Sequence, residues 1–385
     1  SMYEDEFREG LQKLLDEIFH PDIDFTQTEM EDFIASLDGE NDNMYVYSMG
    51  TSPVNNFDIP IVIFTKVDLS GAKTLEEAAA LICADNKLVI HYQAQIHGNE
   101  PAGGEAALNM IARLDGQWGD GLLDTINCYV IPRVNPDGSK SFTRASGQGV
   151  NLNRDMMLAT QPETAALRYV CDLFQPDINI DGHEFTYQPE LASGSYSDLM
   201  CSSGANGHFS EEFIQLSETM ARNHFQTFYD YGLQPSYYTN KANSYSPATN
   251  SGYHSTRGTL HFLMESRGIG GGNYTMPRRV VCHLIMAESI FEYAVANHET
   301  ITSIVDAERV RSIQLGETYE EDDVIKLKFE DTLLEEYTHK LSKWNLVSGT
   351  LTSVSDQVPI FYRVAQEGKA RVRPTAYVFP DGETW

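Results

Sequence analysis

The chain has 385 residues, and its 27 Lys and Arg against 56 Asp and Glu give it a formal net charge of −29. With 41% hydrophobic and 22% charged residues, the composition is that of a folded globular protein and not of a disordered one. Nucleic-acid backbones and anionic membrane surfaces both attract clusters of Lys and Arg, so we expect neither as a partner. The longest apolar runs also fall far short of the ~20 residues of a spanning helix, so we expect no membrane insertion.

The N-terminal residues leave the cellular location open. Met2 is followed by acidic residues, whereas a secretory signal begins with basic ones. Ser1 ahead of Met2 is typical of a cloning remnant, so a native leader could have been removed. The alternatives are an extracytoplasmic location (periplasmic or secreted) and the cytoplasm. The oligomeric state is likewise unknown from the sequence.

The five cysteines are widely spaced, odd in number and free of any Cys-x-x-Cys pair. This pattern predicts neither a disulfide framework nor a thiolate zinc site. Cys83 and Cys128 lie in apolar stretches, so we expect them to be small core residues.

In chain order, the first forty residues are expected to form two short acidic helices, the second with Thr28 as N-cap and Glu31 three residues on. From about residue 44, short apolar strands alternate with helices. This pattern predicts an α/β fold with a mostly parallel mixed sheet and helices on both faces. Strands are expected at 44–48, 59–64, 87–95, 126–132, 177–181 and 259–265, and helices at 75–82, 102–114, 162–174, 208–229 and 278–295.

Three parts follow from this pattern. Residues 1–43 form an acidic helical segment, 44–304 the main α/β domain, and 305–385 a small β-rich C-terminal appendage. The last boundary is placed where the alternation stops and a charge-rich stretch precedes two β-leaning segments. The appendage could be a folding cap, a partner-binding module or the front part of a longer chain.

Polar side chains follow four of the predicted strands at their carboxyl ends. In open α/β sheets ligands bind beyond these ends, so the four segments are expected to converge on one site. They are His97-Gly98-Asn99-Glu100, Asn135-Pro136-Asp137-Gly138, Gly182-His183-Glu184 and Glu265.

Two imidazoles and a carboxylate in these segments match a metal site. His97 and Glu100 form an H-x-x-E pair, and His183 would complete the His₂Glu set of a catalytic zinc ion. From its position alone, Glu265 either pairs with nearby Arg267 or faces a cleft, where it could act as a general base.

A glycine-containing loop carries Arg144 and the pair Asn153-Arg154. On so acidic a chain, loop arginines are commonly solvated or paired with surface carboxylates. A guanidinium is also the side chain best suited to bind a carboxylate through two hydrogen bonds, or to stabilise an oxyanion.

Five short motifs together resemble the zinc metallocarboxypeptidases of the carboxypeptidase A family, and are most similar to its compact bacterial branch. In chain order they are HGNE (97–100), NPDG (135–138), RxxxxGVNLNR (144–154), DGHE (181–184) and FLMESRG (262–268). The likeness extends over about residues 45–300, which makes the main domain the expected catalytic domain. It implies one zinc ion per chain, bound by His97, Glu100 and His183.

The same resemblance implies roles for other residues. Glu265 would be the general base and acid that acts on water activated by zinc, and Arg144 would polarise the scissile carbonyl and stabilise its oxyanion. Asn153 and Arg154 would bind the C-terminal carboxylate of a peptide substrate. The family also places a mobile tyrosine over the substrate, and Tyr253, 12 residues before Glu265, is one candidate.

The chain departs from the family pattern at two positions and leaves two assignments open. Asn151 stands where the family usually has Asp, and Gly182 stands where a bulky apolar residue usually precedes the third ligand. Tyr245 and Tyr238 are further candidates for the covering tyrosine. Among the remaining histidines, which we expect to be structural or solvated, His261 is the one expected to support the site.

The resemblance implies zinc-dependent hydrolysis of peptide bonds that releases C-terminal amino acids one at a time, with a cell-wall peptide as one substrate within this reaction. The alternative is an N-acyl amino-acid deacylase similar to aspartoacylase and succinylglutamate desuccinylase, which share the HGNE pattern. The NPDG motif favours the peptidase. A non-catalytic binding protein has little support because all three ligands and the base are present.

Overall fold

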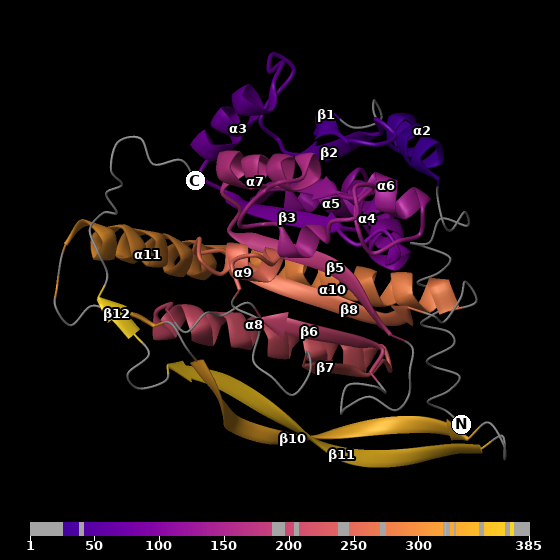
Figure 1. Ribbon diagram of the computed structural model, residues 1–385, viewed down its shortest axis with the longest axis vertical. Coiled ribbons are helices and arrows are strands. Elements are labelled where there is room, and N and C mark those ends of the chain that lie inside the picture. The colour runs from indigo at the N-terminus through magenta and orange to yellow at the C-terminus, as the bar shows by residue number, and fades with distance from the viewer. Residues whose placement is uncertain are drawn as a thin grey trace.

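A computed structural model gives the arrangement of the chain in space (Figure 1). It describes residues 26–37, 42–186, 197–203, 208–237, 246–269, 275–318, 320, 324–326, 329–345, 350–365 and 370–372. The first of the two expected acidic helices lies outside these residues.

An eight-stranded mixed sheet forms the centre of the molecule, with the strand order β1-β2-β4-β3-β5-β8-β6-β7. The four central strands β4, β3, β5 and β8 run parallel, while β1, β2 and β6 each pair antiparallel with a neighbour. The predicted fold class is therefore confirmed. The bounds are β1 Met44–Thr51, β2 Asp58–Phe64, β3 Leu88–Ala94, β4 Ile126–Ile131, β5 Ile178–Thr186, β6 Leu199–Ser203, β7 Pro235–Tyr237 and β8 Leu260–Ile269.

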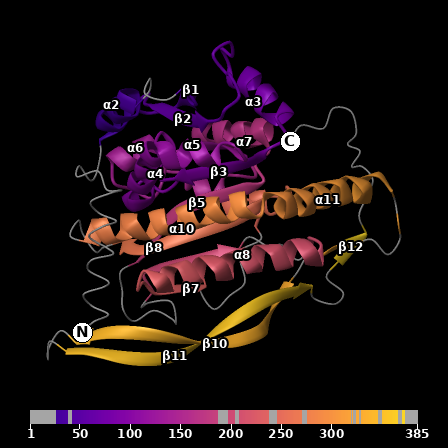
Figure 2. The same cartoon turned by 180° about the vertical axis from the view of Figure 1, so that it is seen from behind.

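Two hydrophobic cores cover the two faces of the sheet, because alternate residues of each strand point to opposite faces. One core packs α2, α4, α8 and α10 against residues such as Ile90 and Ile180, and Figure 2 shows α8 and α10 over this face. The other packs α3 and α7 against residues such as Val89 and Ile63. The helices are α2 Gln27–Leu37, α3 Leu75–Ala84, α4 Pro101–Leu114, α5 Gln117–Leu122, α6 Pro136–Lys140, α7 Pro162–Phe174, α8 Glu211–Asp230, α9 Asn250–His254, α10 Met276–Ala296 and α11 His298–Glu317, with a 3-10 turn at Leu152–Arg154.

The N-cap predicted for α2 was wrong by two residues. The T-x-x-E pattern occurs twice in succession, and the structure uses the first copy: the Thr26 hydroxyl accepts from the Glu29 N–H, and the Glu29 carboxylate accepts from the Thr26 N–H. These reciprocal bonds satisfy two donors at the helix start. Thr28, the predicted cap, lies inside the helix. The expectation for Cys83 was also wrong, because this thiol is exposed.

Two of the strands that carry site residues are longer than predicted. β5 and β8 pair in register from Ile178 to Phe185 of β5, so His183 lies within a strand and not after it, and Glu265 lies inside β8 and not at its end. The polar side chains look like turn signals in the sequence, yet the backbone hydrogen bonds of the parallel ladder continue beneath them. The short strands β6 and β7 were not predicted.

The C-terminal part begins with a helix that the sequence did not indicate. α11 continues to Glu317, past the expected boundary at residue 304. Strands follow as β9 Val324–Lys326, β10 Phe329–Asn345, β11 Thr350–Ala365 and β12 Ala370–Val372, and they form two antiparallel pairs, β10–β11 and β9–β12. The division of the chain into three parts remains a prediction. No helix among the described residues is by itself long and apolar enough to cross a membrane; α10 and α11 would meet that length and composition only as a pair, and they meet at a bend of 88°.

Candidate active site

Polar side chains occupy one face of the three central strands β3, β5 and β8. Residues two apart on a strand share a face, and neighbours in register on parallel strands also share it, so these side chains form rows across the sheet. From the amino toward the carboxyl ends of the strands, the rows are His91–Asn179–His261, Gln93–Asp181 and His183–Glu265. The opposite face of the same strands packs in an apolar core, except near the carboxyl ends, where Glu184 and Ser266 are buried. The last row, His183–Glu265, lies next to the residues that follow β3.

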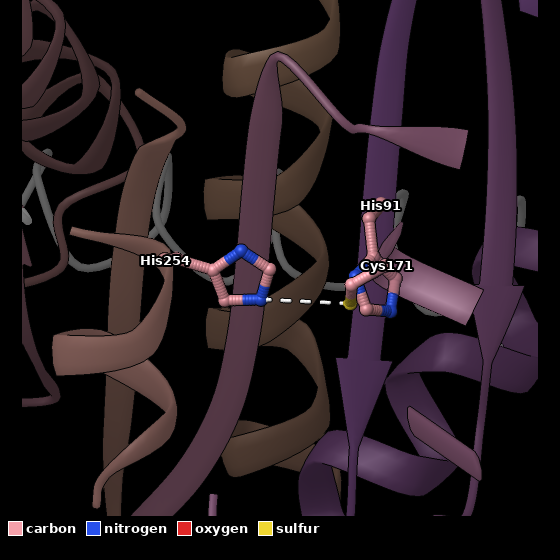
Figure 3. Close-up of side chains that lie close together, drawn as sticks. All are labelled: His91, Cys171 and His254. Atoms are coloured by element: carbon pink, nitrogen blue, oxygen red, sulfur yellow. Dashed lines mark hydrogen bonds between the residues drawn. The ribbon is translucent and has the colours of Figure 1, made fainter. Parts of the chain in front are cut away.

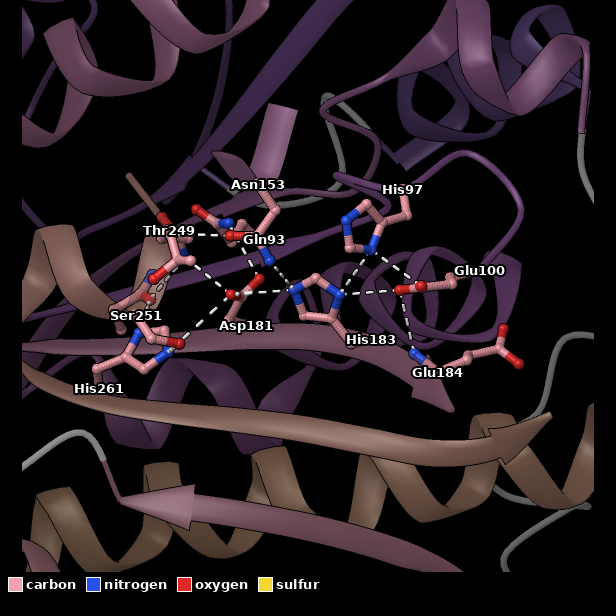
Figure 4. A network of polar contacts seen from close by, with 12 residues as sticks. Gln93, His97, Glu100, Asn153, Asp181, His183, Glu184, Thr249, Ser251 and His261 are labelled. Carbon is pink, nitrogen blue, oxygen red and sulfur yellow. Dashed lines mark hydrogen bonds and ion pairs between the residues drawn. The ribbon is translucent and has the colours of Figure 1, made fainter. Parts of the chain in front are cut away.

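Three predicted metal ligands lie together at this end of the sheet (Figure 4). Glu100 bridges the two imidazoles, with its Oε1 2.9 Å from Nδ1 of His97 and its Oε2 2.8 Å from Nδ1 of His183. The two Nδ1 atoms are 3.2 Å apart. All three side chains are buried, and each offers one ligand atom within 4.8 Å of the others. The structure therefore brings together the set expected from the sequence.

The motifs around these ligands hold two turns in very close contact. A Cβ added to Gly98 would lie 2.0 Å from the carbonyl carbon of Gly138, so neither the HGNE turn nor the NPDG turn leaves room for a side chain at residue 98. Asn135 joins the same turns, because its side-chain amide donates to the carbonyls of Ile96 and Ala145. The NPDG motif thus has a structural purpose here, which is to position the ligand turn and the loop that carries Arg144.

A buried ion pair helps to fix the position of Glu100. Glu184 accepts a hydrogen bond of 2.7 Å from the Ala102 N–H in the first turn of α4, and it also pairs with Arg279 of α10. The Glu184 N–H in turn donates to Oε2 of Glu100 over 3.2 Å. The start of α4, and with it Glu100 at the N-cap position, is therefore tied to β5 and α10.

Each imidazole is held by a partner on the side away from the cluster. Nε2 of His97 lies 3.2 Å from Oδ1 of Asn151, and Nε2 of His183 lies 3.2 Å from Oδ2 of Asp181. An acceptor at Nε2 fixes the proton there and leaves the Nδ1 lone pair toward the cluster, which is the arrangement found around metal-bound histidines. Asn151 thus keeps, as a neutral acceptor, the place where the family usually has Asp.

Asp181 is the residue of this network that the sequence did not reveal. Its carboxylate accepts from Gln93 over 3.1 Å and from the Asn250 side chain over 2.9 Å, and it also faces His183. These bonds and the histidine lower its pKa, although burial opposes the shift. Its place two residues before His183 on the same strand was the available signal. His261, expected to support the site, reaches Asp181 at 4.0 Å.

When no cation is bound, the histidines and carboxylates of the cluster shift one another's pKa values. Burial opposes protonation of His183, but the carboxylates of Asp181 and Glu100 raise its pKa well above its usual value. Burial likewise opposes ionisation of Glu100, yet hydrogen bonds from His183 and His97 lower the pKa of this carboxylate. A cation that binds at Nδ1 of His183 must therefore displace a proton.

Glu265 lies on β8 directly beside His183 of β5, so both side chains point to the same face. Burial, followed by the carboxylates of Glu100 and Asp181, raises its pKa to about 8, although His183 and Arg144 oppose this. A cation in the cluster would lower this value. A carboxyl group that changes protonation near neutral pH is suited to accept and return a proton.

The structure places Arg144 beside the cluster and leaves Arg154 exposed in the same loop. Nη1 of Arg144 is 2.9 Å from Oε1 of Glu100, and the Arg144 side chain is 47% exposed. Arg154 is exposed and donates to the carbonyl of Asn153 over 2.6 Å. The Asn153 side chain points inward: its Nδ2 lies 3.4 Å from Nε2 of His183, and its Oδ1 accepts from the Asn250 N–H.

Tyr253 is the predicted site residue that the structure does not bring to the cluster. Its ring is buried in the core beside α7, its hydroxyl donates to Asp172 over 2.9 Å, and the guanidinium groups of Arg168 and Arg257 lie 5.6 and 5.1 Å from the ring centroid. These contacts hold the side chain against α7, so the expectation that it covers the substrate is corrected. The other candidates, tyrosines 238 and 245, lie outside the described residues.

Close packing of α4 against β5 explains the glycine at position 182. An added Cβ would lie 3.4 Å from the Cα of Gly103 and from the Cβ of Ala94, so α4 packs directly on the backbone of β5. This close contact brings the start of α4, and therefore Glu100, near His183. The departure from the family pattern is thus matched by a second glycine on the facing helix.

Comparison with known proteins agrees with this geometry. A family model described as zinc carboxypeptidase matches residues 30–232, a little over half of the chain. The chain belongs to the zinc carboxypeptidase family. The resemblance seen in the sequence is therefore confirmed, and the match includes the HGNE, NPDG and DGHE motifs.

Curated relatives of this chain include proteins named carboxypeptidase 2. The chain is 29% identical over 241 residues to probable carboxypeptidase 2 of Arthroderma benhamiae, a match that covers 58% of this chain and 46% of that protein. It is 26% identical over 295 residues to carboxypeptidase 2 of Trichophyton rubrum, covering 72% and 53% respectively. The chain spans about half the length of the curated relatives it matches.

Solved carboxypeptidase structures share the fold. A metallo-carboxypeptidase from Burkholderia cenocepacia superposes with a TM-score of 0.54 at 16% identity, covering 70% of this chain and 69% of the other. A metallo-carboxypeptidase from Pseudomonas aeruginosa, in complex with (2-guanidinoethylmercapto)succinic acid, gives a TM-score of 0.52 at 15% identity, covering 72% and 70%. At these identities the likeness supports the fold class alone.

Proposed function

We propose that this chain is a zinc-dependent peptidase that removes amino acids from the C-terminus of peptides, with one zinc ion per chain. The observation that carries the proposal is the cluster of His97, Glu100 and His183 with Glu265 on the next strand. Membership of the zinc carboxypeptidase family and the names of the curated relatives support the same reaction.

The residues of the cluster fit a zinc ion. Two imidazoles and one carboxylate are the donors of many catalytic zinc sites, which keep a further position open for water or substrate. Asn151 and Asp181 hold the outer nitrogens of the two histidines, so both Nδ1 atoms can bind a cation. Bound zinc would supply a Lewis acid that polarises the scissile carbonyl and makes water a better nucleophile.

The chain's own groups would move the proton and bind the charges. Glu265 accepts a proton from the attacking water at its carboxylate and returns it to the nitrogen of the departing amine. Arg144, about half exposed beside Glu100, stabilises the negative charge that develops on the carbonyl oxygen.

An exposed arginine gives the preference for a free C-terminus. Arg154 lies in the same loop as Arg144, on a chain whose net charge is −29, and its guanidinium can bind a carboxylate through two hydrogen bonds. The ligand of the Pseudomonas relative, a substituted succinic acid, also carries carboxylates. Asn153 would orient Arg154 and the loop, since its own side chain is engaged with Asn250.

The test is the Glu265→Gln variant, which keeps the shape of the side chain and removes the base. We expect kcat on a blocked dipeptide with a free C-terminus to fall by about 10²- to 10⁴-fold, while zinc binding is kept. Glu288→Gln on α10, a carboxylate outside the cluster, is the matched control and should keep kcat within about twofold. Near-wild-type turnover of Glu265→Gln would overturn the proposed mechanism.

Substrate panels separate the peptidase from the deacylase. The peptidase hydrolyses peptides with a free C-terminus and loses activity when that terminus is amidated, because Arg154 then has no carboxylate to bind. A deacylase instead prefers N-acyl amino acids over peptides. Exclusive activity on acyl-amino acids would replace the proposal with this alternative.

A further inference from the structure

A second group of metal-binding side chains lies on the same face of the sheet, nearer the amino ends of the strands. His91 belongs to β3, Cys171 to α7 and His254 to α9, so three separate elements bring them together (Figure 3). Each is buried, with at most 1% of its surface exposed. One ligand atom from each residue lies within 4.8 Å of the others.

The thiol of Cys171 lies between the two imidazoles. Its Sγ is 3.9 Å from Nδ1 of His91 and 3.9 Å from Nε2 of His254. Burial lowers the pKa of His91 to about 3 and the pKa of His254 well below its usual value, so both rings are neutral and each has one lone pair. The single proton of the thiol can serve the lone pair of His254, because the amide of Asn179 already donates to Nδ1 of His91.

The two rings present their lone pairs to the thiol. Within the described part of the chain, Nε2 of His91 and Nδ1 of His254 have no hydrogen-bond partner. These are the ring nitrogens that do not face Cys171, and with the proton on them the lone pair of each ring lies on the nitrogen that faces the thiol. A cation between Cys171 and the two rings would use both facing lone pairs and the thiolate together.

We propose that His91, Cys171 and His254 form a second metal site, which binds one thiophilic cation inside the core. Two imidazoles and a thiolate are donors that suit Cu⁺ and Zn²⁺ and are poor donors for Mg²⁺ or Ca²⁺. Charge favours Cu⁺, because one thiolate neutralises it, whereas Zn²⁺ would leave a net positive charge in an apolar core. This inference does not depend on the proposed peptidase activity.

The second site is too far from the first to share its chemistry. His91 and His183 lie in rows that are four residues apart along β5, which corresponds to about 13 Å, whereas paired catalytic metals lie about 4 Å apart. The ion therefore has a structural purpose: it joins α7 and α9 to β3. Figure 4 shows the chain of contacts between the two regions, from His183 through Asp181 to His261, and the His261 ring stacks on His254 at 5.7 Å.

One existing contact competes with the cation. Nδ2 of Asn179 donates to Nδ1 of His91 over 2.9 Å, which fixes the lone pair of His91 on the nitrogen that faces Cys171. The ion would take that lone pair, so Asn179 has to give up one hydrogen bond when the site is filled. Asn179 keeps its short contact of 2.6 Å to His261.

The test uses Co²⁺ as a spectroscopic probe for the full-length protein. Bonding of a thiolate to Co²⁺ produces a charge-transfer band in the near ultraviolet, and the proposed catalytic cluster cannot produce this band because it contains no cysteine. We expect the band in the wild-type protein and in Cys83→Ser, which removes an exposed thiol. Cys171→Ser should abolish it and weaken metal binding at this site at least about tenfold.

A second arm identifies the ion and protects against misfolding. Cu⁺ and Zn²⁺ are each titrated against a coloured chelator, and we expect the loss of affinity in Cys171→Ser to be greater for Cu⁺. If Cys171→Ser fails to fold, His254→Gln keeps the thiol and should weaken the Co²⁺ band at least about tenfold. Absence of a band in the wild-type protein together with no retention of Cu⁺ overturns the proposal. A band that is lost in Cys83→Ser and kept in Cys171→Ser overturns it as well.

Discussion

The buried pair of Glu184 and Arg279 permits a quantitative prediction. The Glu184 side chain is fully buried and that of Arg279 is 6% exposed. Replacing Arg279 by Met removes the positive charge and keeps most of the side-chain volume. Breaking a buried pair in this way typically costs about 3–5 kcal/mol, because it leaves one charge buried without a partner.

Protonation of Glu184 sets an upper limit to this cost. Burial already raises the pKa of Glu184, and the loss of Arg279 raises it further, so the variant can take up a proton instead of burying a charge. From an unfolded pKa of about 4.3, forced protonation costs about 5 kcal/mol at pH 8 and about 1 kcal/mol at pH 5. The destabilisation of Arg279→Met should therefore shrink as the pH falls toward 5.

The assay is urea unfolding of the wild type and the variant at pH 8 and pH 5. The double variant Glu184→Gln/Arg279→Met carries no buried charge and should recover most of the loss at pH 8. Lys66→Met, which breaks the exposed pair with Asp124, is the matched control and should leave the urea midpoint close to that of the wild type. A loss below about 1 kcal/mol at pH 8, or equal losses at both pH values, would refute the reasoning.

Four further outcomes follow from the site. Gly98→Ala forces a Cβ into the backbone of residue 138 and should cost more than about 3 kcal/mol in urea unfolding, whereas Gly121→Ala, with no atom within 4 Å, should be neutral or stabilising. Zinc binding should release a proton and weaken as the pH falls, because His183 has a raised pKa in the absence of metal; calorimetry in buffers of different ionisation enthalpy measures this release. Asn151→Ala should weaken zinc binding about tenfold in a chelator competition, and unchanged affinity would show that the contact to His97 is dispensable. Tyr253→Phe should change kcat/KM less than twofold and cost about 1 kcal/mol of stability, since its hydroxyl donates to Asp172 of α7.

Local chemistry explains which elements the sequence predicted well. α7 runs from Pro162 to Phe174 as expected, because a proline at the first helical position fixes its start. β3 is buried throughout, as a central parallel strand should be. The ends of β5 and β8 were placed too early, because polar residues such as His183 and Glu265 look like the end of a strand until the partner strands are known.

The sequence predicted which residues form the candidate site, but not which residues hold them in place. His97 and Glu100 are close in sequence, and the ordered motifs brought in His183. The role of Arg279 depends on contacts between elements that no spacing in the sequence reveals, and Asp181 was signalled only by its place two residues before His183. Tyr253 shows the same limit, since its position relative to Glu265 could not indicate that α7 would hold its hydroxyl.

The polar rows across β3, β5 and β8 also have a consequence for folding. Side chains on a strand alternate between faces, so a slip of β5 by one residue would turn Asn179, Asp181 and His183 toward the apolar core beneath α4. None of these groups would find its partner there, and Ile178 and Ile180 would lose their place in that core. Misregistered pairings of the central strands are therefore strongly disfavoured. The polar residues on this face of the central strands therefore also favour the correct register of the sheet during folding.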